Sequence, residues 1–133
     1  DCREEQLQAA KAWSIWEGST SKLHYDPKLV EHFADEDFAI AIARIENHYF
    51  INKLFLTERP ILDHLESIAH LPIAIVQGRY DIVCPPGSAW LLHKSLPSST
   101  IKMVPASGHS ATEPGIRSEL VSCADDFIKK LSS

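Results

Sequence analysis

Pro72-Ile73-Ala74-Ile75-Val76-Gln77-Gly78 is a short apolar run between a proline and a glycine, and the architecture of the chain follows from it. Such a run is typical of a strand buried in a parallel sheet. A second strand is predicted from Thr100 to Val104, with helices over residues 88–95 and after Pro114-Gly115. The order strand, helix, strand, helix is typical of a parallel sheet with helical crossovers, so we expect an α/β fold.

The residues before this pattern are predicted to be wholly helical. Three helices are expected there, over residues 4–17, 27–33 and 35–55. The first should end at Gly18, since glycine commonly terminates a helix. The third has a predicted buried stripe at helical spacing, made of Phe38, Ile42, Ile45 and Tyr49. We therefore divide the chain into a helical segment, residues 1–58, and an α/β segment, residues 59–133.

Composition and charge exclude several classes of protein. The 133 residues carry 13 basic and 18 acidic side chains, a formal net charge of −5. Nucleic acid and anionic membrane surfaces require clustered Lys and Arg, so neither is expected as a partner. Three widely spaced cysteines predict no disulfide framework and favour the cytoplasm. The seven histidines lack zinc-binding spacing, and no metal or other cofactor is expected.

Two polar residues follow the two predicted strands. Asp81 comes after the first strand and His109 after the second. Reacting groups in parallel α/β sheets lie in loops past the strand C-termini, so both are candidates for chemistry. The aspartate would accept a hydrogen bond from the imidazole and orient it, leaving Nε2 to take a proton from a nucleophile. Taken singly, an aspartate in such a turn is more often part of the turn itself.

Four blocks of sequence carry a resemblance to a known family. Two surround the candidate acid and histidine, Ile75-Val76-Gln77-Gly78-Arg79-Tyr80-Asp81-Ile82-Val83-Cys84-Pro85 and Gly108-His109-Ser110-Ala111-Thr112-Glu113-Pro114-Gly115-Ile116. Two lie in the helical segment, Ala12-Trp13-Ser14-Ile15-Trp16-Glu17-Gly18 and Ala43-Arg44-Ile45-Glu46-Asn47-His48-Tyr49-Phe50. The first pair resembles the triad-aspartate and triad-histidine segments of proline iminopeptidases. The second pair is similar to two segments of their helical cap and is the more specific.

The resemblance implies the C-terminal part of an α/β-hydrolase, its last two parallel strands and helices preceded by cap segments. Residues 1–58 would belong to the cap and residues 59–133 to the core. The implied activity is that of a serine peptidase that removes an N-terminal proline from a peptide substrate, with Asp81 and His109 as catalytic residues. The sequence departs from the family in one respect: its five glycines form no G-x-S-x-G nucleophile elbow. We therefore expect a fragment that is inactive alone, whose sheet has its remaining strands upstream.

Three further residues are predicted to bind substrate. Glu46 falls by helical phase on the side of Ala39 and Ile42, where a carboxylate would meet a buried amine. A structural acid paired with Arg44 or another basic residue is the alternative that the residues alone favour. The resemblance implies instead that Glu17 and Glu46 bind the substrate amine and that Cys84 lines the proline pocket. The tryptophans are interpreted as packing residues.

Two alternatives stay open. One is a non-catalytic binding protein derived from the α/β-hydrolase fold, which an upstream G-x-S-x-G would exclude. The other is an esterase or an epoxide hydrolase, whose neutral substrate would give the cap glutamates no ammonium to bind. The sequence leaves the oligomeric state open.

Overall fold

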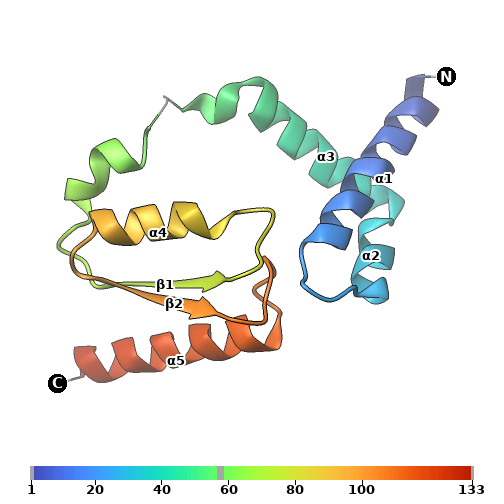
Figure 1. Ribbon diagram of the computed structural model, residues 1–133. Coiled ribbons are helices and arrows are strands. Elements are labelled where there is room, and N and C mark those ends of the chain that lie inside the picture. The colour runs from blue at the N-terminus through green and yellow to red at the C-terminus, as the bar shows by residue number, and fades with distance from the viewer. Residues whose placement is uncertain (1, 57–58, 133) are drawn as a thin grey trace. The chain divides into compact units, whose positions relative to one another are not determined.

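Two units make up the structure, a computed structural model that describes residues 2–56 and 59–132 (Figure 1). The first unit comprises Asp1–Thr20 and His24–Pro60, and the second comprises Ser21–Leu23 and Ile61–Ser133. The predicted division lies between residues 58 and 59, and residues 57–58 lie outside the described ranges. Ser21–Leu23, which the sequence had placed in the helical segment, belongs to the second unit.

The first unit consists of the helices α1 (Cys2–Thr20), α2 (Pro27–Phe33) and α3 (Glu36–Ile51), followed by the 3₁₀ turn η1 (Lys53–Phe55). Aspartates define the starts of α2 and α3. The Asp26 carboxylate accepts hydrogen bonds from the backbone N–H groups of Lys28 and Leu29, and Pro27 occupies the first turn. Asp35 caps α3 in the same way through the N–H of Phe38. Side-chain oxygens at these positions satisfy amides that the helix leaves unpaired.

Helix α1 does not end at Gly18 as predicted but continues to Thr20. Gly18 is buried, and a Cβ placed there would lie 2.9 Å from Cβ and Cγ of Phe33 on α2. The glycine therefore permits a close approach between two helices and does not act as a terminator. Together with the buried Ala10 and Ser14 it forms a row of small residues, four apart, along α1.

Helix α3 is shorter than predicted, and its buried side is different. It ends at Ile51, and Lys53, Leu54 and Phe55 then adopt positive φ angles of 50°, 55° and 57°. The predicted stripe is wrong for Ile45 and Tyr49, which are 60% and 48% exposed, whereas Ala39 is fully buried. The buried side of α3 in this unit is therefore the side of Ala39, and it does not include Ile45 or Tyr49.

The second unit contains the 3₁₀ helix η2 (Leu62–Ser67), strand β1 (Ile73–Gly78), helix α4 (Pro86–Ser95), strand β2 (Ser99–Val104) and helix α5 (Pro114–Leu131). The two strands are parallel, in a register that pairs Ile73 with Ser99 and Gly78 with Val104. Figure 1 shows α4 on one face of this sheet and α5 on the other. Because the strands are parallel and aligned, the loops that follow them leave from the same edge.

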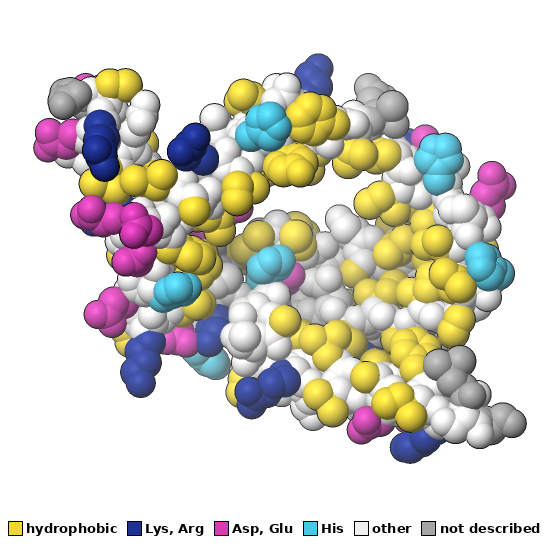
Figure 2. All heavy atoms as spheres, turned by 180° about the vertical axis from the view of Figure 1, so that it is seen from behind, with side chains coloured by type: hydrophobic (Ala, Val, Ile, Leu, Met, Phe, Trp, Pro, Cys, Tyr) yellow, Lys and Arg dark blue, Asp and Glu magenta, His cyan; other side chains and the backbone are white. Residues whose placement is uncertain are grey.

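Strand β1 is only partly buried in the part of the chain that the structure describes. All positions of β1 before Gly78 are half-buried, so the prediction of a fully buried strand is wrong for this chain. The reason is that β1 pairs only with β2 in the part of the chain that the structure describes. Large apolar side chains are exposed in both units, and Figure 2 shows apolar side chains spread over the surface. Within residues 2–56 and 59–132, no helix is long and apolar enough to cross a membrane.

Candidate active site

The loops that follow β1 and β2 bring Asp81 and His109 together. Nδ1 of His109 lies 3.0 Å from Oδ2 of Asp81, so the predicted contact is present. Because a carboxylate only accepts hydrogen bonds, Nδ1 carries the proton and donates it to Asp81. This tautomer leaves Nε2 as the ring nitrogen that is free to accept a proton. The Asp81 side chain is 6% exposed and that of His109 is 40% exposed, so the acid is enclosed and the base is accessible.

The Asp81 carboxylate is held by four donors. Oδ1 accepts from the backbone N–H groups of Val83 at 3.0 Å and Cys84 at 2.7 Å. Oδ2 accepts from Nε2 of Gln77 at 3.2 Å in addition to His109. These four hydrogen bonds fix the orientation of the carboxylate in the loop. A carboxylate bound in this way can orient the imidazole and stabilise its protonated form.

The histidine loop is tied down through its backbone. The N–H groups of His109 and Ser110 both donate to the carbonyl of Ser21, at 3.0 and 2.7 Å. The N–H of Gly108 donates to Oε1 of Glu113 at 2.7 Å. The N–H of Tyr80 donates to the carbonyl of Ser107 at 3.0 Å and so joins the aspartate loop to the histidine loop. The position of the imidazole is therefore set by segments that are far apart in sequence.

Sequence reasoning missed two contributors to this geometry, Gln77 and Glu113. Nε2 of Gln77 donates to Asp81 and also to the carbonyl of Cys84 at 3.2 Å. Gln77 is a single polar side chain at the end of an apolar strand, and that position is the signal that points to it. Glu113 precedes Pro114 at the start of α5, where its local sequence gives no indication of its contact with Gly108.

Glu46 and Glu17 lie in the first unit. The indole Nε1–H of Trp13 on α1 donates a hydrogen bond to Oε2 of Glu46 on α3. Trp13, which was interpreted from the sequence as a packing residue, therefore also donates a hydrogen bond. Glu17 follows Trp13 by one helical turn and so lies on the same side of α1. Arg44, the alternative partner of Glu46, is two residues away on α3, a spacing at which side chains do not face each other.

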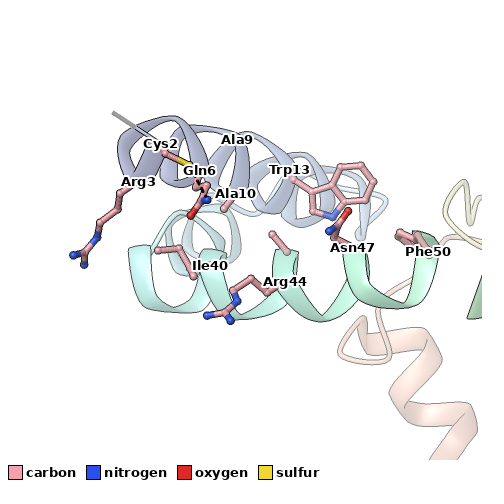
Figure 3. A pocket seen from close by; sticks show the side chains of 11 residues that line it. Cys2, Arg3, Gln6, Ala9, Ala10, Trp13, Ile40, Arg44, Asn47 and Phe50 are labelled. Carbon is pink, nitrogen blue, oxygen red and sulfur yellow. Dashed lines mark hydrogen bonds between the residues drawn. The ribbon is translucent and has the colours of Figure 1, made fainter. Parts of the chain in front are cut away.

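A groove lies between α1 and α3, and Trp13 is one of the residues that line it (Figure 3). Figure 3 shows Trp13 and Phe50 at one end of the groove and Arg3 at the other. The rings of Trp13 and Phe50 meet edge to face, with centroids 6.2 Å apart. None of the five predicted site residues is among the groove's lining side chains.

Cys84 is part of the aspartate loop through its backbone. Its N–H donates to Asp81 and its carbonyl accepts from Gln77, while its thiol is free and the residue is exposed. Thus the residue has a structural role that does not involve sulfur. Across residues 2–56 and 59–132, no three His, Cys, Asp or Glu side chains gather in a group that would hold a metal ion.

Comparisons with known proteins identify relatives along nearly the whole chain. It is 56% identical over 121 residues to a probable proline iminopeptidase of Leptolyngbya boryana, covering 90% of this chain and 38% of that protein. It is 52% identical to the proline iminopeptidase of Xanthomonas citri, covering 92% of this chain and 39% of that protein. For the proline iminopeptidase of Arabidopsis thaliana the identity is 48%, covering 98% of this chain and 34% of the relative. No protein-family model matches the chain.

A solved structure supports the fold. The chain superposes on an esterase from Exiguobacterium antarcticum with a TM-score of 0.63 and 19% identity, covering 95% of this chain and 45% of the esterase. This likeness confirms the predicted α/β-hydrolase fold class. The chain spans about two fifths of the length of the first two curated relatives. The chain is thus a homologue of the proline iminopeptidases and corresponds to a C-terminal portion of those α/β-hydrolases.

Proposed function

We propose that Asp81 and His109 supply the acid and the base of a serine aminopeptidase that releases N-terminal proline from peptides. The observation that carries the proposal is the hydrogen bond from Nδ1 of His109 to the enclosed carboxylate of Asp81. The relatives' names, proline iminopeptidase in each case, support the choice of substrate. The proposed arrangement is a helical cap segment, residues 1–58, and the C-terminal part of the hydrolase core, residues 59–133.

In the proposed reaction, Nε2 of His109 takes the proton of a serine hydroxyl as the hydroxyl attacks the carbonyl carbon of proline. The imidazolium that forms is stabilised by Asp81 and then gives its proton to the leaving amine of the next residue. Water completes the cycle by hydrolysing the prolyl-enzyme with the same histidine as base. The 133 residues hold no G-x-S-x-G, so we assign the nucleophile to residues outside this sequence.

The substrate amine is assigned to the two cap glutamates. Glu46 is half-buried and held by the indole N–H of Trp13, and Glu17 lies on the same side of α1 as Trp13. A proline ammonium has two N–H donors, one for each of two carboxylate acceptors. We assign Cys84 to the wall of the proline pocket. The three free cysteines favour the cytoplasm as the compartment.

The test uses the complete enzyme that carries these residues. The purified protein should hydrolyse proline arylamide and should hydrolyse the N-acetylated analogue only slowly. Turnover should be lost when His109 is replaced by Ala. The 133 residues alone should give no turnover, because the nucleophile is absent. Strong turnover of N-acetylproline arylamide, or of simple esters in preference to both, would overturn the aminopeptidase assignment in favour of the esterase alternative. Absence of any hydrolytic activity would favour the non-catalytic alternative.

A further inference from the structure

Glu113 is a buried carboxylate that the proposed reaction does not use. It is 6% exposed and stands immediately before α5, with Pro114 in the first turn of that helix. Its Oε1 accepts from the N–H of Gly108 at 2.7 Å, and its Oε2 accepts from the N–H of Leu23 at 3.3 Å. Removing a carboxylate from water is costly, so a buried one that binds two backbone amides is placed there for its acceptors.

These two bonds link Glu113 to both backbone segments that hold His109 in place. The Leu23 N–H belongs to the segment Ser21–Leu23, whose Ser21 carbonyl accepts from the N–H groups of His109 and Ser110. Glu113 therefore binds the residue before His109 directly and binds, through Leu23, the segment that holds His109 itself. The space is tightly filled, since a Cβ on Gly108 would lie 2.9 Å from the Leu23 nitrogen and 3.2 Å from Oε1 of Glu113.

We propose that Glu113 is a positioning residue for His109, a role that rests on the proposed function of that histidine. By holding Gly108 directly and the segment Ser21–Leu23 through Leu23, it keeps Nδ1 of the imidazole directed at Asp81. A carboxylate suits this task because both of its oxygens accept, whereas an amide would turn an N–H₂ group toward one of the two N–H donors. Within the described residues Glu113 forms no hydrogen bond with Asp81 or with the imidazole, and its effect is transmitted through Gly108 and Ser21–Leu23.

The experiment compares Glu113→Gln and Glu113→Asp with wild type in the complete enzyme, with Asp125→Asn as the control. Gln keeps the length and loses one acceptor, while Asp keeps the charge and is one methylene too short. Asp125 is an exposed carboxylate on α5, the helix that Glu113 precedes. We expect kcat to fall by about 10- to 100-fold in Glu113→Gln, the scale of one lost charged hydrogen bond. KM should change less than twofold, and the control should match wild type in both.

A second readout does not depend on proline cleavage. The Nδ1 proton shared with Asp81 gives a low-field NMR signal, which should be retained in the control and lost or shifted in Glu113→Gln. If proline arylamides are not substrates but this signal still responds to Glu113, the proposed function fails and the positioning role stands. An unchanged signal with unchanged kcat overturns the positioning role. So does a variant without native circular dichroism, because Glu113 would then support the fold as a whole.

Discussion

A Cβ placed on Gly78 would lie 1.8 Å from the carbonyl oxygen of Gly108, so the backbones of the two loops meet with no room for a side chain. Gly78 ends β1 three residues before Asp81, and Gly108 directly precedes His109. Backbone hydrogen bonds reinforce the approach. The N–H of Arg79 donates to the carbonyl of Val104 at 3.0 Å, and the N–H of Tyr80 donates to the carbonyl of Ser107 at 3.0 Å. The distance between acid and histidine therefore depends on a glycine.

Replacing Gly78 by Ala in the complete enzyme should separate the two loops. The added methyl group meets backbone atoms, which cannot rotate away, and we expect a loss of about 1–3 kcal/mol in the free energy of unfolding, as in overpacked sites. We expect kcat to fall by more than tenfold because His109 moves away from Asp81. Urea titration and steady-state kinetics measure the two effects.

Gly87→Ala is the matched control. Gly87 lies in α4, and beyond the adjoining backbone of that helix no atom of the described residues comes within 4 Å of an added Cβ, so alanine there should be neutral or stabilising by up to about 1 kcal/mol. Equal effects of the two substitutions would show that Gly78 is not needed for the approach of the loops.

Asp81→Asn should leave the fold intact and remove most of the activity. The Asn oxygen can still accept from the N–H groups of Val83 and Cys84, but its N–H₂ group then faces Nδ1 of His109 and favours the wrong tautomer. We expect kcat to fall by about 10³–10⁴-fold, the scale known for this change in a triad. A variant that keeps more than a tenth of wild-type kcat would remove Asp81 from the proposed triad. Asp125→Asn controls for the loss of a carboxylate.

Glu17→Gln and Glu46→Gln should lower the preference for a free amine. The expected loss is about 1.5–3 kcal/mol, the cost of a charged hydrogen bond, or roughly 10- to 150-fold in kcat/KM. The measurement compares proline arylamide with its N-acetylated analogue for wild type and both variants. If both variants keep the full preference for the free amine, the two carboxylates are structural.

Trp13→Phe should show whether the indole N–H matters to Glu46. Phenylalanine keeps an aromatic ring against Phe50 but cannot donate to Oε2 of Glu46. We expect KM for proline arylamide to rise about three- to tenfold, consistent with a lost hydrogen bond of 0.5–1.5 kcal/mol. Trp16→Phe is the control, since Trp16 is an exposed tryptophan on the same helix. A rise in KM of the same size in both variants would point to packing.

Cys84→Ala should retain most of the activity, because the residue holds Asp81 through its backbone N–H and not through its thiol. A bulky maleimide should inhibit the wild-type enzyme by filling the proposed proline pocket and should not inhibit Cys84→Ala. Cys2→Ser tests the reagent's selectivity, since Cys2 is also exposed. Loss of all turnover in Cys84→Ala would mean that sulfur has a chemical role.

Much of the fold could be predicted from local sequence. The starts of α2 and α3 follow from Asp26 and Asp35, whose side chains cap the nearest amides, and the strands follow from short apolar runs bounded by Pro and Gly. The α/β class and the contact between Asp81 and His109 follow from the order of elements, because parallel strands deliver their loops to one edge. The more specific α/β-hydrolase class was implied only by the resemblance of the four sequence blocks. The roles of Glu17, Glu46 and Cys84 remain predictions.

What only the tertiary structure decided are the contacts between segments that are distant in sequence. Gly18 was predicted to end α1, but it lies against Phe33, and no local pattern distinguishes a glycine that terminates a helix from one that admits a neighbour. Ile45 and Tyr49 match a helical stripe in the sequence, yet packing around Ala39 turns another side inward. Glu113 meets Leu23 across 90 residues. Helix caps and strand periodicity are set by neighbours along the chain, and sequence shows them. The choice of buried face and of backbone partner is set by what folds against each element.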